Sequence, residues 1–595
     1  MFTDLPTLHR FETFPPAKDR QYWGKIAALE RNAGLISELK KGADAAKVQP
    51  VPPLSAVDYM KFQRNGNRID YELPYFARRY NLEALVITET LEHRGEYLDA
   101  IAEYLWHIDS ELTWVLPAHA LFDTPAQFAD PAETLPPREH TVVDLFSAET
   151  ASFLATTLTL LGEEIAAAVS RNLVNTTLEL IDLRVLRNTE VNLDRWGWRR
   201  GRNNWTPWCA SDLLWTASAI MTDDIRFTAF ARRLQTVTDR YFERYPEDGG
   251  CDEGPGYWNL SPVRYALYAE GIYRASDGEV DLFAGEKFRN MADYAGYAWY
   301  AKNRAATFAD CGGRHQVYTG MIRRMVRRSG ASRSLRMTRD FEAQNGLHAF
   351  GHTGLLMTLF ELAEPACTPA EAAAVPHDYL HVYPLTEQLH VRCGEFFVAM
   401  KGGHNGESHN HNDIGEFVFG SGGKMVVADI GTGEYTKATF GPKRYDNWVQ
   451  SGLGHNPPVF DGTAQAPGPE FRSGGFTVEG TPGSFTATCD LTPAYPAELG
   501  LKSCVRKLHF DGETLTVTDS FAAEKPLEMT VRLFHECPGV EVAGEGFETT
   551  RSELPLDDSW LRAAWGEKLY ETRLAAPKAA AGEITYVIAP PSPSR

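Results

Sequence analysis

The first part of the chain repeats apolar residues at the spacing of an amphipathic helix. Between residues 227 and 241, apolar positions recur every three or four residues, and charged residues occupy the other faces. This spacing places one apolar stripe along a helix, and a surface helix buries such a stripe against the core. The apolar positions are Phe227, Phe230, Leu234, Val237 and Tyr241, and the charged ones are Arg232, Arg233, Asp239 and Arg240.

Further segments of this kind follow one another through the first two thirds of the chain. An apolar stripe over residues 153–161 comes after Asp144 and Ser147, either of which can cap the start of a helix. Residues 213–221 and 263–273 carry similar patterns, and short turns rich in Gly, Pro or Asp separate the segments. Short turns favour antiparallel neighbours, so we expect an array of helix pairs.

The hydrophobic period changes after about residue 375. The later segments are short, rich in β-branched and aromatic residues, and bounded by Gly, Asp and Asn, which is typical of strands. They are residues 389–400, 415–419, 424–427 and 505–510. One hairpin is nearly explicit, because the alternation up to Phe510 ends at Asp511-Gly512 and resumes at Leu515, as a two-residue turn requires.

Length and composition support two domains. At 595 residues, the chain exceeds the size at which a single hydrophobic core keeps growing. Hydrophobic residues make up 43% and charged residues 23%, which excludes the disordered and fibrous classes. We expect a helical domain in residues 1–375 and an antiparallel β domain of stacked sheets in residues 376–595, joined by a Pro- and Ala-rich linker near 364–376.

The formal net charge of −20 repels nucleic acid and anionic membrane surfaces, so a polyanionic substrate would need a locally basic cleft. The 8 cysteines are scattered without a CxxC pair, as is typical of reduced thiols. The N-terminus lacks the basic and apolar regions of a secretion signal, and no run of about 18 apolar residues occurs. We therefore expect a cytoplasmic location, with a periplasmic one as the alternative if an upstream signal is missing.

The densest polar cluster is a stretch rich in His and Asn. If the chain is extended there, His409, His411 and Asp413 lie on one side, because side chains two residues apart share a face of a strand. Imidazole and carboxylate groups brought together suit metal binding or proton transfer. Asp429 and His455 end neighbouring predicted strands, and with His411 they would make a set of two histidines and one carboxylate. The alternative is a polar loop with hydrogen-bonded histidines.

A second cluster interrupts the helical part, where Gly and Pro residues expose Tyr257 and Trp258 before the next helix. A tyrosine has a pKa of about 10 and needs nearby cations to act as a base at neutral pH. Cations are at hand in Arg195, Arg199, Arg200, Arg202, Arg314 and His315. The alternative is that both aromatic residues, with Trp205 and Trp208, belong to the core and that the arginines are solvated.

A third feature is a basic stretch from Arg323 to Arg339, which contains only arginines among its charged residues. It could line a groove for a polyanion, or it could be the solvated face of a helix.

These residues resemble the heparinase II/III-like polysaccharide lyases. The resemblance rests on four blocks in order, namely residues 203–205, 252–258, 409–415 and 451–462. It implies an N-terminal (α/α) toroid followed by a C-terminal antiparallel β-sandwich. It also implies cleavage of uronic-acid polysaccharides by β-elimination, in which the carboxylate is neutralised, the C5 proton is removed and the O4 glycosidic bond breaks to leave a 4,5-unsaturated uronate.

The resemblance also implies roles for individual residues. Asn204 matches the position that neutralises the uronate carboxylate, with the adjacent Asn203 as the alternative. Tyr257 matches the catalytic tyrosine, which donates a proton to the leaving oxygen and could be the base for one C5 epimer. His409 matches the catalytic histidine, the base for the opposite epimer or a partner in neutralisation. Substrate-binding positions are expected at Arg202, Asn203, Trp205, Trp258, Arg314, His315 and His404.

His411, Asp429 and His455 match the metal ligands of the family. Such ligands suit Zn²⁺, with Mn²⁺ as the alternative, and we expect a mainly structural role in ordering the loop that presents His409. Two features depart from the family pattern. Asn-Pro-Pro follows His455 where relatives often continue a strand, and the missing secretion signal favours imported oligosaccharides over intact polymers.

The residues alone are compatible with several functions. The first expectation is a lyase for glycosaminoglycans such as heparan sulfate, hyaluronan or chondroitin, and the nearest alternative is a lyase for alginate or another polyuronate. A toroid glycoside hydrolase would need two carboxylates that flank the bond, for which Asp252 and Glu253 are the candidates. A non-catalytic protein would use the aromatic residues to bind carbohydrate. The expected partner is an acidic polysaccharide or oligosaccharide, with no nucleic acid and no membrane, and a homodimer is left open.

Overall fold

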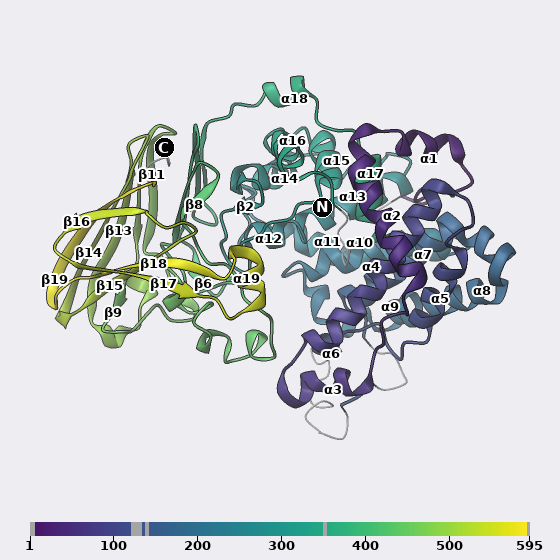
Figure 1. Ribbon diagram of the computed structural model, residues 1–595, viewed down its shortest axis with the longest axis horizontal. Helices are drawn as coiled ribbons and strands as arrows, with labels where there is room; N and C mark the ends of the chain where they lie inside the picture. Colours follow the sequence, from purple (N-terminus) through teal and green to yellow (C-terminus); the bar gives the residue numbers. More distant parts are fainter. Residues whose placement is uncertain (1–5, 121–133, 137–141, 349–353, 592–595) are drawn as a thin grey trace.

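The chain folds into a helical region that lies beside a stack of β-sheets (Figure 1). The structure is a computed structural model and describes residues 6–120, 134–136, 142–348 and 354–591. The helices are α1 (Arg20–Ala27), α2 (Ala33–Val48), α3 (Ala56–Asn65), α4 (Ile69–Glu92), α5 (Leu98–Asp109), α6 (Pro117–Ala120), α7 (Leu145–Ile165), α8 (Arg171–Ile181), α9 (Arg187–Asn192), α10 (Trp205–Ile220), α11 (Asp224–Arg244), α12 (Gly254–Trp258), α13 (Pro262–Ala275), α14 (Glu286–Ala298), α15 (Thr319–Ser329), α16 (Arg333–Asn345), α17 (Leu355–Ala363), α18 (Pro369–Ala373) and α19 (Ser559–Trp565).

The strands begin with a short pair inside the helical region, and the others lie in the C-terminal region. They are β1 (Trp299–Ala301), β2 (Arg304–Ala305), β3 (Tyr379–Tyr383), β4 (Gln388–Cys393), β5 (Phe396–Lys401), β6 (His404–Asn405), β7 (Phe417–Ser421), β8 (Lys424–Val427), β9 (Val459–Phe460), β10 (Gly468–Arg472), β11 (Gly475–Thr481), β12 (Ser484–Asp490), β13 (Leu501–Phe510), β14 (Leu515–Leu527), β15 (Met529–His535), β16 (Glu541–Glu545), β17 (Glu548–Pro555), β18 (Lys568–Ala575) and β19 (Ala579–Ala589).

The toroid is built from helices that start and pack as the sequence predicts. At the start of α7, the Asp144 carboxylate accepts from the Ser147 N–H, and the Ser147 hydroxyl accepts from the Asp144 N–H. This reciprocal cap satisfies donors that a helix start leaves without partners. The predicted stripe of residues 227–241 lies buried on α11. Neighbouring helices pack together, including α2 with α4, α7 with α10, and α14 with α16, so the predicted array of helix pairs is confirmed as an (α/α) toroid.

One described helical run, Leu145–Arg195, is long and apolar enough to cross a membrane by length and composition. However, 50% of the residues in its most apolar 18-residue stretch are buried inside the protein. In this run, α7 packs against α10 and α4. Burial against other helices is also what the core helix of a globular domain shows, so this run is weak evidence for a membrane span.

The β domain consists of stacked antiparallel sheets, as predicted. One sheet has the order β3-β4-β5-β7-β8, a second has β11-β12-β13-β14-β19-β16, and a third has β17-β18-β15-β9. Alternate residues of β5 face opposite sides, as the two-residue period of a strand requires. Val398 and Met400 join the core shared with the second sheet, whereas Phe397 and Ala399 pack in a cluster with Tyr300 and Phe308 of the helical region. The first sheet therefore has both faces buried.

Two local predictions need correction. The run of residues 389–400 is not one strand, because Gly394, with φ of +54°, turns the chain between β4 and β5. The hairpin of β13 and β14 is confirmed, but its last pair is Phe510 with Leu515. Four residues therefore connect the strands, and the Asp511 carboxylate accepts the N–H groups of Glu513 and Thr514 there. The side chain takes over hydrogen bonds that a two-residue turn would make through its backbone.

The basic stretch from Arg323 to Arg339 is neither a polyanion groove nor a solvated face. Arg323 is fully buried, and Arg324 and Arg327 pair with Glu364. Arg333 and Arg336 donate to the backbone carbonyls of Pro376 and Val375. These arginines attach α15 and α16 to the predicted linker, which is thereby fixed to the toroid.

Glu83 is a buried acid in α4. One carboxylate oxygen accepts from the Thr358 hydroxyl, and the other has no hydrogen-bond partner among the described residues. Burial raises the pKa of Glu83 from 4.5 to about 7, with the Thr358 bond acting weakly in the opposite direction. The folded protein therefore holds this proton more tightly than the unfolded chain does.

We predict that Glu83→Gln removes a pH-dependent loss of stability. The stabilisation from the bound proton is complete below about pH 4.5 in the wild type and is lost as the pH rises through about 7. The neutral amide keeps it, so the variant should gain up to about 3 kcal/mol on the wild type between pH 5 and 8. Calorimetric melting at both pH values measures this gain, with the exposed Glu38→Gln as control. Parallel pH profiles for wild type and Glu83→Gln would contradict the assignment.

Candidate functional site

A cavity of about 900 Å³ lies where the toroid meets the β domain. Asn204 just before α10, Tyr257 in α12 and His409 in the loop between β6 and β7 all line it. Since these residues come from segments far apart in the sequence, only the packing of the two regions brings them together.

The three side chains form one contact chain. His409 Nε2 lies 3.4 Å from Asn204 Oδ1, and the His409 ring stacks on the Tyr257 ring with centroids 3.6 Å apart. The Tyr257 hydroxyl shares a hydrogen bond of 2.9 Å with the hydroxyl of Tyr435, which also lines the cavity. The sequence did not reveal Tyr435, because a single tyrosine in a Gly-rich loop has no periodic or motif signal.

The backbone around these side chains is tightly constrained. Gly254 starts α12 with φ of +78°, and a Cβ at this position would lie 2.2 Å from the carbonyl oxygen of Phe308. Only glycine allows this approach. His409 has φ of 59°, a left-handed conformation that costs a non-glycine residue about 1–3 kcal/mol. The Asp310 N–H donates to the His409 carbonyl at 3.1 Å and holds this conformation.

Asp310 is the central anion of the site. One carboxylate oxygen lies 3.0 Å from His409 Nδ1, and the other lies 3.0 Å from His411 Nε2 and 2.7 Å from the Arg444 guanidinium. Burial opposes its charge, but Arg444 and the two histidines hold the pKa of Asp310 well below its ordinary value. Asp310 stands in the sequence just before Arg314 and His315, but no pattern distinguishes it from other loop acids.

Tyr257 differs from the sequence expectation in its electrostatics. Burial first, and then the Asp310 charge, raise the pKa of Tyr257 well above its usual range, and Arg68 opposes this only weakly. The cations expected to lower the tyrosine pKa do not do so, because Arg200, Arg202 and Arg314 are exposed elsewhere on the cavity wall. Tyr257 is therefore a protonated phenol at neutral pH.

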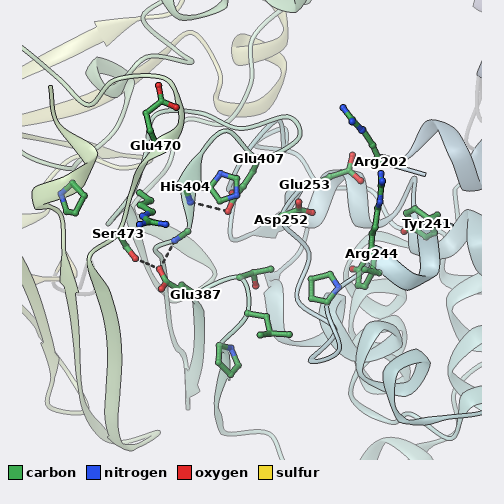
Figure 2. A pocket seen from close by; sticks show the side chains of 18 of the residues that line it. Arg202, Tyr241, Arg244, Asp252, Glu253, Glu387, His404, Glu407, Glu470 and Ser473 are labelled. Carbon is green, nitrogen blue, oxygen red and sulfur yellow. Dashed lines mark hydrogen bonds between the residues drawn. The ribbon is translucent and has the colours of Figure 1, made fainter. Parts of the chain in front are cut away.

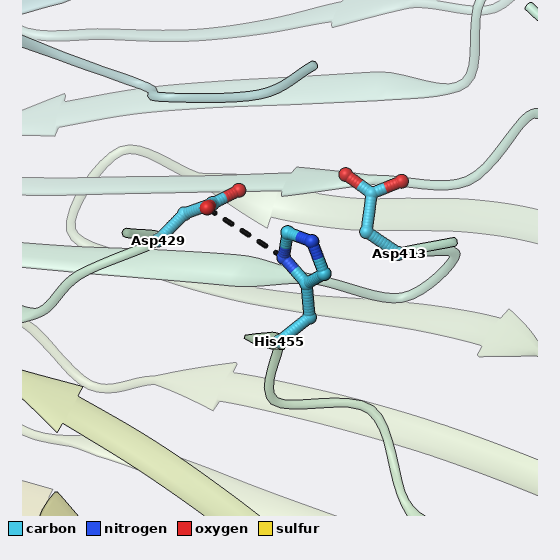
Figure 3. A group of neighbouring side chains, drawn as sticks. All are labelled: Asp413, Asp429 and His455. Atoms are coloured by element: carbon cyan, nitrogen blue, oxygen red, sulfur yellow. Dashed lines mark ion pairs between the residues drawn. The ribbon is translucent and has the colours of Figure 1, made fainter. Parts of the chain in front are cut away.

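A second cluster lies behind the loop that carries His409. Asp413, Asp429 and His455 are all buried, and each has a ligand atom within 4.8 Å of the others. Figure 3 shows the His455 ring between the two carboxylates, with its Nδ1 3.5 Å from Asp429 Oδ1. His411 lies beside the cluster, with its ring centroid 5.1 Å from that of His455.

This cluster fits a divalent cation. Buried polar atoms without hydrogen-bond partners among the described residues include His411 Nδ1, Asp413 Oδ2, Asp429 Oδ2 and both ring nitrogens of His455. Leaving such atoms unpaired is costly, and a cation would satisfy them. Of the predicted set of His411, Asp429 and His455, the last two lie in this cluster together with Asp413, whereas His411 lies beside it. The other oxygen of Asp413 accepts from buried Lys401 at 2.8 Å.

Residues 383–575 match the family described as heparinase II/III-like, C-terminal. The match covers most of the β domain. This finding confirms the resemblance seen in the sequence. No curated protein matches the chain.

Solved structures share the fold over nearly the whole chain. Heparinase III is 11% identical, with 97% of this chain and 93% of that chain covered and a TM-score of 0.59. Heparan sulfate lyase HepC from Pedobacter heparinus is 12% identical, with coverages of 98% and 93% and a TM-score of 0.51. A chondroitin AC lyase mutant from Streptomyces coelicolor A3 is 12% identical, with coverages of 97% and 83% and a TM-score of 0.50. At these identities the likeness is one of fold, and it confirms the toroid and β-sandwich architecture.

Most of the substrate-binding positions expected for a heparinase II/III-like chain line the main cavity. They are Arg202, Asn203, Trp205, Arg314 and His315. Of the two asparagines, Asn204 contacts His409, whereas Asn203 Oδ1 accepts from the nearby Trp205 N–H. Burial lowers the pKa of His315 to about 4. Trp258 does not reach the cavity, because it is fully buried and donates to the Met291 carbonyl.

His404 lines a second cavity of about 730 Å³ rather than the main one. Figure 2 shows this cavity between the two regions, with Arg202 and Arg244 on the toroid side and His404 and Glu407 on the β-domain side. Glu253 separates the two cavities, since it lines the second while its Oε2 lies 3.3 Å from the Asn204 N–H and 3.5 Å from His409 Nε2. Arg202 lines both cavities.

We predict that the buried cluster binds about one divalent cation per chain and that His455→Ala abolishes this binding, because a histidine ligand is lost from a desolvated set. Elemental analysis after loading with Zn²⁺ or Mn²⁺ and dialysis measures the bound metal. Chelation should lower the melting temperature of the wild type but not that of the variant. Exposed His509→Ala is the matched control. Equal metal content in wild type and His455→Ala would contradict the assignment.

Proposed function

We propose that this protein is a polysaccharide lyase that cleaves uronic-acid-containing glycosaminoglycans, or their oligosaccharides, by β-elimination. The convergence of Asn204, Tyr257 and His409 on one cavity wall is the observation that carries the proposal. The names of the structural neighbours support it, since they include heparan sulfate and chondroitin lyases.

Asn204 would neutralise the uronate carboxylate. Its side chain lies in the cavity beside His409, and an amide can donate to a carboxylate without adding a charge of its own. Charge moves onto the carboxylate when the C5 proton leaves, so a donor fixed in advance lowers the barrier.

His409 would take the C5 proton at Nε2. Its Nδ1 is bound to Asp310, so Nε2 is the nitrogen that faces Asn204 and the cavity. Tyr257 would donate its proton to the leaving O4, because its raised pKa keeps the phenol protonated until the bond breaks. The Tyr435 hydroxyl, hydrogen-bonded to that of Tyr257, can return a proton to it.

The cavity carries positive charge for an anionic substrate. Arg200, Arg202 and Arg314 line it, are exposed, and have no acidic partner among the described residues. In a chain of net charge −20, such free guanidinium groups are a local exception that favours carboxylate and sulfate ligands. The buried cluster would hold Zn²⁺ or Mn²⁺, which when bound orders the loop that presents His409.

We predict that Tyr257→Phe loses elimination activity. Without the proton donor, kcat should fall about 10²- to 10⁴-fold. The assay is the ultraviolet absorbance of the unsaturated product during incubation with heparan sulfate, hyaluronan, chondroitin and alginate oligosaccharides, and Tyr570→Phe on β18 is the control. New reducing ends without this absorbance would show hydrolysis instead of elimination and would contradict the proposal.

We predict that Arg314→Ala weakens substrate binding without slowing the chemical step. An exposed guanidinium contributes roughly 1 kcal/mol to binding an anion, so KM should rise about 3- to 10-fold. The difference should shrink at high salt, because ions screen exposed charges. Steady-state kinetics at two ionic strengths test this, with exposed Arg551→Ala on β17 as control. A lower kcat at unchanged KM would exclude a binding role.

A further inference from the structure

Asp310 connects the two clusters of the site. It lies in the toroid between β2 and α15, and its side chain is fully buried against loops of the β domain. Its two carboxylate oxygens bind different histidines, with 3.0 Å to His409 Nδ1 and 3.0 Å to His411 Nε2. The histidine that faces the cleft and the histidine beside the buried cluster therefore share one carboxylate.

These bonds determine which nitrogen of each imidazole ring binds Asp310 and which one remains for another partner. A carboxylate only accepts, so both contacting nitrogens must carry hydrogen. His409 then presents Nε2 to the cleft, 3.4 Å from Asn204 Oδ1. His411 Nδ1 is buried without a hydrogen-bond partner among the described residues, and the His411 ring centroid lies 5.1 Å from that of His455 in the cation cluster.

The surroundings hold Asp310 itself in place. Its own N–H donates to the His409 carbonyl, so backbone and side chain bind the same residue. Arg444 binds the carboxylate at 2.7 Å and also donates to the carbonyl of Asn410, the residue between the two histidines. The segment is thus fixed on both sides of Asn410.

We propose that Asp310 is a positioning residue that orients His409 for proton transfer and His411 for cation binding at the same time. The state of the buried cluster and the reactivity of the cleft then depend on a single side chain. The part that concerns His409 rests on the proposed lyase function, whereas the part that concerns His411 does not.

Asp310→Asn tests both roles together, because the neutral amide lacks the charge that binds both imidazole N–H groups and has only one acceptor oxygen. We expect kcat to fall about 10- to 100-fold with KM within about threefold, and Co²⁺ affinity to fall about 10- to 100-fold. Product absorbance measures the first effect. Titration of the metal-free full chain with Co²⁺, followed by its visible absorption bands, measures the second and needs no substrate.

Asp293→Asn is the matched control, since Asp293 accepts the N–H groups of Ser332 and Ser334 at the start of α16, away from both clusters. Loss of only one property in Asp310→Asn would overturn the shared role. If Asp310→Asn fails to fold, Asp310→Glu, which keeps the charge but displaces it, should show both losses to a smaller degree. A wild type inactive on every substrate would contradict the lyase proposal, and unchanged Co²⁺ affinity in Asp310→Asn would still overturn this inference.

Discussion

The apolar contact between the toroid and the first β-sheet is the constraint on which the site depends. Phe397 and Ala399 of β5 pack in one cluster with Tyr300 and Phe308 of the helical region. The sheet is therefore buried on both faces. Alternate residues of β5 pack into two different hydrophobic cores, because side chains of a strand alternate between its faces. Since the same segment of the helical region continues directly to Asp310, this packing also determines how close the side chains that the two regions contribute to the cavity come.

The fold was largely predictable because it follows from periodicity. Three-and-four spacing predicted α11 and its neighbours, and alternation predicted the strands around Phe510. The errors arose where single side chains override the pattern. Asp511 caps its own turn, and Arg333 and Arg336 bind backbone carbonyls of the linker, which no charge count reveals.

The site was predictable only where residues stand in motifs. Asn204, Tyr257 and His409 came from a resemblance in short blocks, and the structure places them in contact. Asp310 and Tyr435 lie in irregular loops, and their importance comes from partners more than 90 residues away in sequence, as the separation of 99 between Asp310 and His409 illustrates. Such partners are defined by the tertiary fold, so a single sequence without periodicity or motif cannot identify them.

The pKa values of the acids in the site depend on burial as much as on which residues are present. The acids Glu253 and Asp310 both contact His409, yet burial raises the pKa of Glu253 well above its usual range while Arg444 and the histidines keep Asp310 ionised. Two carboxyl groups within reach of one imidazole therefore have pKa values shifted in opposite directions.

The division of the site between the two regions has an evolutionary consequence. Asn204, Tyr257 and Asp310 belong to the helical region, whereas His409, His411 and the cation cluster belong to the β region. Recombination that exchanged only the C-terminal region between relatives would carry the histidines away from the carboxylate that orients them. The two regions are consequently expected to be inherited as one unit, even though each has a hydrophobic core of its own.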